Sequence, residues 1–212
     1  METKRVRVIG AGLAGSEAAL QLASFGFDVD LYEMRPEKPT PAHRGGALAQ
    51  LVCSNSFKGL ALTSAHGLLK NELNMLGSFL LKAAERTAVP AGESLTVNRD
   101  LFSEEVERLI LACPNITLHR EEVKTLEGEF PTIVAAGPLA SDTLADDIFK
   151  RLGSERLHFF DAIAPVVETE SIDFEHAFYK NRWEKGETED FINCPLDKET
   201  YDLFVQKLRE AE

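Results

Sequence analysis

The sequence predicts an α/β fold of the Rossmann type, built on a parallel sheet, and three observations near its start predict it. A short apolar run at 6–9 is too brief for a helix and ends on a glycine-rich turn, residues 10–15. A helical pattern follows, and an alternating run at 28–32 then ends on Glu33. Strand, glycine-rich turn, helix, strand and acid in this order are typical of the βαβ unit of a dinucleotide-binding domain.

The glycine-rich turn, Gly10-Ala11-Gly12-Leu13-Ala14-Gly15, has the residue types that such a site needs. Gly10 permits a sharp turn, Gly12 lets the backbone approach a pyrophosphate, and Gly15 lets helix and strand pack closely. Phosphates are favoured at the helix N-terminus by free N–H groups and by the helix dipole. Glu33 follows Gly15 by 18 residues, where a carboxylate can bind a ribose hydroxyl. A βαβ unit that binds nothing is the alternative, and the combined spacing disfavours it.

The remaining elements are predicted from periodicity and capping residues. The first helix is predicted from apolar residues that fall on one face: Leu13, Ala14, Ala18, Leu22 and Phe25. A helix at 68–86 contains Gly77, which we expect to be kept by close packing. The same helix carries a leucine stripe that we interpret as core packing: Leu69, Leu73, Leu76 and Leu80. Further helices are predicted at 98–111, with Asn98 as its N-cap, at 141–152, with Ser141 as its N-cap, and at 196–212. Strands are predicted at 94–97, 116–118, 123–126, 133–134 and 163–167.

Two segments of this pattern bear on function. Residues 33–67 show little regular structure, and a loop of this length in a compact domain is usually functional or disordered; its small polar residues favour a functional loop. Ile133 and Val134 are predicted to form a buried strand beside the first one, with Gly137 leaving room for a cofactor. An ordinary core strand closed by a Gly-Pro turn is the alternative.

Composition narrows the class of protein. The 212 residues are 44% hydrophobic and 27% charged, which is typical of a soluble globular protein. No apolar run approaches the ~18 residues of a membrane span, and the N-terminus does not resemble a signal peptide. Three widely spaced cysteines without zinc-type spacing indicate free thiols in a reducing cytoplasm, with no metal site.

The net charge of −12 disfavours nucleic-acid binding through the whole surface. Residues 35–70, however, contain five basic residues and one acid, a local net charge of +4. Within this basic segment, Arg44 and Lys58 are candidates for phosphate contacts, although solvated surface is nearly as plausible for both. His43 and His66 are possible proton carriers, but exposed loop histidines are more often bystanders.

Cys53 is the candidate catalytic residue. It lies in the basic segment and precedes three small polar residues. Nearby cations lower the pKa of a thiol, and the thiolate is the nucleophile. A free cysteine is usually buried and inert, and we keep that interpretation for Cys113 and Cys194.

The motifs in order resemble one family. VIGAGLAGSEAA, LYEMRP, PAHR, LVCSNSF, VPAG, VNRD, AAGP, FFDAIAPVVE and NCPLDKETYDLF are similar to TrmFO, formerly Gid, the folate- and FAD-dependent tRNA (uracil-54, C5) methyltransferases. The resemblance covers the chain from residue 1 to about 212. The related MnmG (GidA) family, which modifies the wobble uridine with FAD, shares the first motif, but LVCSNSF and PAHR favour TrmFO.

This resemblance implies a set of ligands and site residues. FAD is the expected cofactor, methylenetetrahydrofolate the one-carbon donor, NAD(P)H the reductant and tRNA the substrate, with the basic segment 35–70 as a candidate contact. The FAD-binding positions carried over are Gly10, Ala11, Gly12, Leu13, Ala14, Gly15, Glu33 and Gly137. Cys53 matches the family's functional N-terminal cysteine, and it either adds to the uracil or acts through the flavin.

The resemblance also implies a domain organisation. Residues 1–160 are expected to form a Rossmann-like FAD-binding domain of the GidA-related flavoprotein type, and residues 161–212 the start of a second, inserted α+β domain. Family members extend further and carry a second cysteine and a second glycine-rich segment, so we expect an N-terminal portion or a shortened relative. A nucleotide-binding protein without turnover is the alternative from another functional class.

Overall fold

The computed structural model describes residues 4–153, 167–181 and 189–211. Its contacts divide the chain into two compact units. The first comprises Met1–Val89 with Ser94–Ala164, and the second comprises Pro90–Glu93 with Pro165–Glu212. The predicted boundary between residues 160 and 161 lies outside the described residues.

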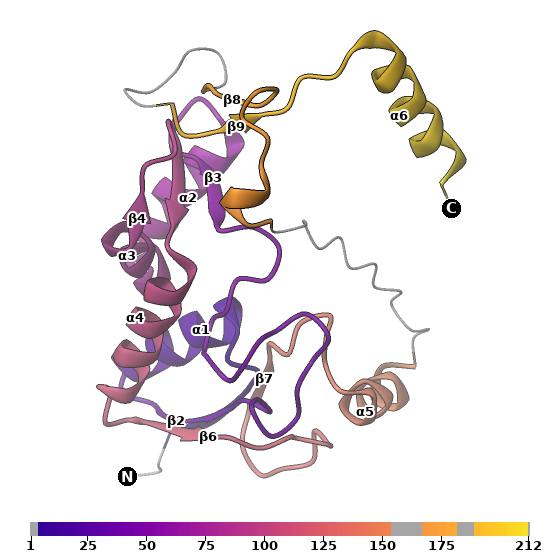
Figure 1. Ribbon diagram of the computed structural model, residues 1–212. Helices are drawn as coiled ribbons and strands as arrows, with labels where there is room; N and C mark the ends of the chain where they lie inside the picture. Colours follow the sequence, from indigo (N-terminus) through magenta and orange to yellow (C-terminus); the bar gives the residue numbers. More distant parts are fainter. Residues whose placement is uncertain (1–3, 154–166, 182–188, 212) are drawn as a thin grey trace. The chain divides into compact units, whose positions relative to one another are not determined.

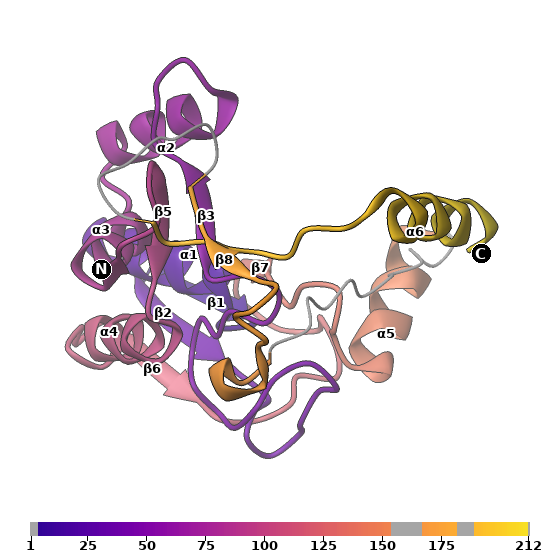
Figure 2. The ribbon, with the colours of Figure 1, turned by 45° about the horizontal axis from the view of Figure 1, so that its top comes forward.

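The first unit contains a parallel sheet of four strands in the order β6-β2-β1-β7 (Figures 1 and 2). Its strands are β1 (Arg5–Ile9), β2 (Asp28–Tyr32), β6 (Ile116–His119) and β7 (Thr132–Val134). In register, Val8 lies opposite Leu31 of β2 and Ile133 of β7. The parallel sheet confirms the predicted α/β fold, including the position of β7 beside β1.

Helices α1 (Leu13–Ser24) and α4 (Arg99–Leu111) cover the sheet and enclose the core with it. Val8 and Leu31 of the sheet are fully buried, as are Phe102 and Val106 of α4. Helix α4 begins where predicted, because the Asn98 side chain accepts hydrogen bonds from the N–H groups of Asp100 and Leu101.

The apolar residues from which α1 is predicted do not form its buried face. Leu13 and Phe25 are 38% and 74% exposed, whereas Ser16, Ala19 and Leu20 are buried. The glycine-rich turn decides which face of α1 is buried. Gly15 is buried directly against the backbone of the turn, so the residues that share its face of the helix also lie against the sheet. Close backbone approach therefore decides the helix orientation over side-chain size.

A small antiparallel sheet in the order β3-β5-β4 adjoins this core, with α2 beside it (Figure 2). It consists of β3 (Ser56–Gly59), β4 (Ala88–Val89) and β5 (Ser94–Val97). The segment 33–67, predicted to hold little regular structure, thus contains a strand and the first turn of a helix. Strand β3 escapes prediction because it has four residues, of which Phe57 is the one apolar side chain, and Lys58 within it has a left-handed φ of 69°.

The single helix predicted at 68–86 is two helices, α2 (Ala65–Met75) and α3 (Phe79–Arg86). Gly77 adopts a left-handed φ of 81° between them. Its N–H donates to Asn74 O at 2.9 Å, and the N–H of Ser78 donates to Leu73 O at 3.0 Å, which is a Schellman ending. Gly77 is therefore kept for its backbone angle and not for close packing.

The leucine stripe is not core packing as predicted. Leu80 of α3 is buried, but Leu69 and Leu76 are 55% and 75% exposed. The break at Gly77 separates the stripe into two helices, and α2 buries only Gly67 and Lys70. Amphipathic spacing alone does not show what a helix packs against.

The crossover to β7 also differs in part from prediction. Residues 123–126 form no strand, and Ile133 and Val134 are 39% and 42% exposed because β7 is an edge strand of this sheet. Helix α5 (Asp142–Leu152) follows the predicted cap, since the Ser141 side chain accepts from the N–H of Leu144.

The described part of the second unit is small. It contains the short helix η1 (Thr169–Ser171), the antiparallel pair β8 (Phe178–Tyr179) and β9 (Ile192–Asn193), and the helix α6 (Lys198–Glu210). Most of the strand predicted at 163–167 lies outside the described residues. Across the described residues, no helix has the length and apolar content to cross a membrane, and no cluster of three or more His, Cys, Asp or Glu suits a metal ion.

Candidate functional site

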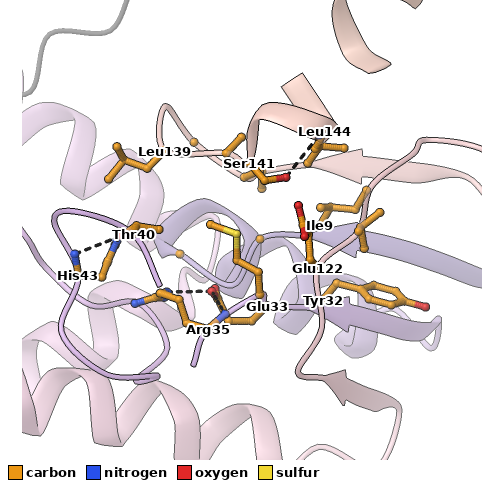
Figure 3. A pocket seen from close by; sticks show the side chains of 18 of the residues that line it. Ile9, Tyr32, Glu33, Arg35, Thr40, His43, Glu122, Leu139, Ser141 and Leu144 are labelled. Carbon is orange, nitrogen blue, oxygen red and sulfur yellow. Dashed lines mark hydrogen bonds and ion pairs between the residues drawn. The ribbon is translucent and has the colours of Figure 1, made fainter. Parts of the chain in front are cut away.

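A pocket of about 300 Å³ opens at the carboxyl ends of β1, β2 and β7. Its walls are the glycine-rich turn, the end of β2, the segment that follows β2, and the connection from β7 to α5; Figure 3 shows side chains from these walls. The carboxyl edge of a parallel sheet is where open α/β folds bind their ligands. The sequence predicts its site at this edge.

Two glycines of the turn shape the pocket through backbone geometry. Gly10 has a φ of 97°, and a Cβ there would lie 2.6 Å from the carbonyl oxygen of Ala135. A Cβ on Gly15 would overlap the carbonyl oxygen of Gly10. Any side chain at either position would push α1 away from β1 or β1 away from β7.

Gly12 has a different role. It is the N-cap residue of α1, its φ of −73° suits any residue, and a Cβ there would meet nothing within 4 Å. It lines the pocket with Leu13 and Ala14. The first N–H groups of α1 have no intrahelical acceptor, and Gly12 offers no side-chain cap. This end of the pocket is therefore suited to an anion such as a phosphate.

Glu33 is the charged residue at the centre of the site. Glu33 is 5% exposed, and its carboxylate accepts bonds from the N–H of Ala11 at 3.1 Å and from the N–H and Nε of Arg35 at 3.1 and 2.8 Å. Burial would raise the pKa of Glu33, but the Arg35 guanidinium and the two N–H groups outweigh it and lower that pKa below its ordinary value. Glu33 is thus held ionised at neutral pH.

Glu33 retains capacity to bind a ligand. A carboxylate offers about four acceptor positions, and the three bonds from Ala11 and Arg35 use three of them. A ribose hydroxyl can donate to the remaining one, whereas a phosphate would be repelled. The geometry favours an unphosphorylated ribose beside Glu33.

The wall opposite the turn is residues 34–50, which we call the wall segment. Met34, Arg35, Thr40, His43 and Gln50 of this segment line the pocket. The segment contains no helix or strand and is held by hydrogen bonds. One of them joins the two walls directly, since the N–H of residue 49 donates to the carbonyl of residue 11 at 2.9 Å.

The third side of the pocket is the connection around β7. Ala135, Ala136 and Gly137 line it, and Gly137 has a left-handed φ of 66°. Glu122 lies at the pocket edge, paired with Lys38 at 2.6 Å. The Lys38 amine and then the Ser141 hydroxyl lower the pKa of Glu122 below its ordinary value.

The predicted cofactor residues fall into two groups. Gly10, Gly12, Leu13, Ala14, Glu33 and Gly137 line the pocket. Ala11 and Gly15 are buried beside it, where Ala11 bonds Glu33 and the wall segment and Gly15 permits close packing. Sequence reasoning missed the lining residues Thr40, Gln50, Glu122 and Ser141. For Ser141 a signal existed, because it was identified as a helix cap on a loop that leaves the sheet edge.

Cys53 is exposed, and its neighbour Val52 lines the pocket. The Cys53 carbonyl accepts a bond from the Arg99 guanidinium at 3.4 Å. Cys113 is half-buried, but Cys194 is exposed, so the expectation of a buried thiol is wrong there.

The basic segment is not a basic surface. Arg35 is buried against Glu33, and Lys38 is paired with Glu122. Lys70 is 7% exposed, its amine donates to the carbonyls of residues 57 and 66 at 2.7 and 2.8 Å, and burial lowers its pKa. Of the five cations counted in the sequence, Arg44 and Lys58 remain as exposed side chains.

The fold and the pocket define a class of protein. It is a Rossmann-type domain whose pocket lies at the carboxyl edge of the sheet, beside the glycine-rich turn. The chain belongs to the family described as glucose inhibited division protein A, whose model matches residues 5–212.

Two curated relatives illustrate the similarity. The chain is 50% identical over 209 residues to the methylenetetrahydrofolate–tRNA-(uracil-5-)-methyltransferase TrmFO of Lactobacillus helveticus, which covers 99% of this chain and 51% of that protein. It is 49% identical over 207 residues to the TrmFO of Desulfitobacterium hafniense, covering 98% of this chain and 47% of that protein. The chain thus spans about half the length of the curated relatives it matches.

Among solved structures, Aquifex aeolicus GidA is similar with a TM-score of 0.48 and 22% identity, over 59% of this chain and 20% of that one. The fold described here rests on the chain's own sheet order and not on that likeness.

Proposed function

We propose that this chain forms the FAD-binding part of a methylenetetrahydrofolate–tRNA (uracil-5-)-methyltransferase. The observation that carries the proposal is the identity of about half of all residues, along nearly the whole chain, with relatives of that name. It favours this activity over wobble-uridine modification by the related MnmG proteins.

The residues of the pocket fit one end of FAD. The N–H groups at the start of α1 would bind the pyrophosphate, and the open space at Gly12 would let it approach the backbone. Glu33 would accept a bond from a ribose hydroxyl, and the small residues Ala136 and Gly137 keep the β7 side open. Ala11 and Gly15 would act from behind by holding this geometry.

The reaction needs both a nucleophile and a reductant. Uracil C5 attacks a carbon donor readily only after a nucleophile has added at C6. The methylene carried by the folate needs two further electrons to become a methyl group, and NAD(P)H is the proposed source. FAD, when bound, supplies the redox chemistry between these two reactants.

Cys53 is the proposed catalytic residue of this chain. It is an exposed thiol in the segment that follows the wall segment. Either role, adding to the uracil or acting through the flavin, requires an accessible sulfur, and the exposure of Cys53 supports both. The target base must leave its stack to reach such a thiol, at a cost of a few kcal/mol.

The partner proposed for this chain is tRNA, and the proposed location is the cytoplasm. Of the basic segment 35–70, Arg44 and Lys58 are the proposed phosphate contacts, because the other three cations are engaged within the protein. We propose no oligomeric state.

FAD retention tests the cofactor assignment. The chain is mixed with excess FAD, desalted, and its visible absorption is recorded beside that of Gly12→Ala and of Gly59→Ala. We expect a flavin band in the parent and in Gly59→Ala. Gly59 does not line the pocket, and a Cβ there would lie 3.9 Å from its nearest neighbour. Gly12→Ala should retain much less flavin. A colourless parent protein contradicts FAD binding by this chain.

Methyl transfer from methylenetetrahydrofolate to uracil in tRNA, with NAD(P)H, tests the activity. We expect it to depend on Cys53, so that Cys53→Ser is inactive while Cys113→Ser is active. A chain that retains FAD without any methyl transfer would be a nucleotide-binding protein without turnover.

A further inference from the structure

The wall segment, residues 34–50, has no regular structure of its own to fix its shape. The Gln50 side chain joins the end of the segment to its middle. It accepts from the N–H of Arg44 at 3.0 Å and donates to the Arg44 carbonyl at 2.8 Å. The Arg35 side chain also reaches Gln50 at 3.3 Å. These bonds give the segment internal order, but they do not attach it to the core.

The end of the segment is attached to the core by the buried Leu48 and by the bond from the N–H of Ala49 to Ala11. Arg120, just beyond the end of β6, attaches the segment at two points further back. Its Nη1 donates to the carbonyl of Arg35 at 3.1 Å and also to the carbonyl of Gly46. Its Nη2 donates to Glu107 Oε1 at 2.8 Å. One guanidinium therefore joins two points of the wall segment, eleven residues apart in sequence, to a carboxylate of α4.

The anchor at the other end is rigid. Glu107 lies in α4, whose Phe102 and Val106 are fully buried in the core. Only an arginine offers five N–H donors in a fixed fork, so neither lysine nor glutamine can reach both carbonyls and the carboxylate together. Loss of this fork would leave the two carbonyls without their donor.

We propose that Arg120 is a positioning residue that holds the wall segment against the core and thereby keeps the dinucleotide pocket formed. The inference rests on the proposed function for the identity of the ligand, FAD, but not for the movement of the wall. Arg120 does not line the pocket, so its effect on the ligand would pass through the backbone of residues 35 and 46.

Limited trypsin digestion of the full chain, without ligand, tests the wall directly. Arg44 is exposed, so the Arg44–Gly45 bond reports opening of the segment, while the Lys82–Ala83 bond inside α3 reports global unfolding. We expect Arg120→Gln to raise the ratio of cleavage at Arg44 to cleavage at Lys82 by about tenfold, the equivalent of one charged hydrogen bond.

The matched control is Arg108→Gln. Arg108 lies on α4 and pairs with Glu105 at 2.7 Å, but its partner is on the same helix and not in the wall segment. We expect the parent ratio for this variant. Glu107→Gln, which weakens the anchor without touching the wall, should give an intermediate ratio and carries the test if Arg120→Gln does not fold by circular dichroism.

Flavin fluorescence titrations separate this inference from the proposed function. We expect FAD to bind Arg120→Gln about tenfold more weakly than the parent or Arg108→Gln, and to protect Arg44–Gly45 in the parent. Parent-like cleavage in both Arg120→Gln and Glu107→Gln, or an equal rise in Arg108→Gln, overturns the role of Arg120. A parent that does not bind FAD overturns the ligand while the cleavage ratio still decides the role of Arg120.

Discussion

The two walls of the pocket are built in opposite ways. The glycine-rich turn is held by direct backbone packing, in which Gly15 rests on the carbonyl of Gly10. The wall segment is held largely by polar side chains: Gln50 and Arg120 donate to its backbone carbonyls, and the Arg35 side chain pairs with Glu33. The first wall tolerates no added atoms at Gly10 and Gly15, whereas the second depends on a few specific polar groups. Substitutions should therefore fail for steric reasons in one wall and for electrostatic reasons in the other.

The largest effect is expected for Gly15→Val. Its Cβ would overlap a backbone oxygen that cannot move without separating α1 from β1. We expect a loss of about 4 kcal/mol in the free energy of unfolding, measured by urea denaturation. Gly12→Ala on the same turn is the control, with a loss under about 1 kcal/mol because its Cβ meets open space. Equal losses in the two variants would contradict the steric account.

A loss of about 3 kcal/mol is expected for Arg35→Met, because removing one partner leaves the buried Glu33 carboxylate without its cation. Arg44→Met, which removes an exposed cation from the same wall segment, should change stability by less than about 0.5 kcal/mol. Urea denaturation of both variants measures the difference. A similar small change in both would show that the Glu33–Arg35 pair does not hold this wall.

A smaller, pH-dependent effect should come from Glu33 itself. Its folded pKa lies below the ordinary value of 4.5, so its ionised form stabilises the folded state above that value. This contribution is lost as the pH falls through the folded pKa. The stability difference between the parent and Glu33→Gln should therefore shrink from about pH 6 to about pH 3, measured by urea denaturation along a pH series. A constant difference would contradict the assignment.

The smallest effect is expected for Lys38→Met. This residue also ties the wall segment to another part of the protein, through Glu122, but the Lys38 side chain is 42% exposed. Exposed ion pairs contribute about 0 to 1 kcal/mol, so we expect a thermal midpoint close to that of the parent. A loss of stability as large as that of Arg35→Met would mean that the exposure of an ion pair does not decide how much it stabilises the wall segment.

The same contrast explains what the sequence could predict. The turn, α1, β2 and the cap at Asn98 follow from residues close together in the chain, so local patterns indicate them. The wall segment depends on Arg120, which is 74 residues from Gly46, and no local pattern indicates such a bond. The leucine stripe misled for a related reason, since Gly77 is as consistent with a helix interior as with a helix end.

The basic segment shows a further limit of sequence reading. A count of charges does not reveal which cations are satisfied internally, and Lys70 and Arg35 both are. The sequence therefore predicts the part of the candidate pocket that local backbone geometry shapes. It does not predict the part that distant side chains complete.

The position of Glu33 has a practical consequence for separating function from folding. One of its oxygens receives the N–H of Ala11 and the other receives Arg35, so the residue assigned to the ribose also joins the turn to the wall segment. A variant at Glu33 would confuse lost recognition with lost architecture in any genetic or biochemical screen. Gly12, whose Cβ would meet open space, is the position at which we expect a substitution to weaken ligand binding in an otherwise intact protein.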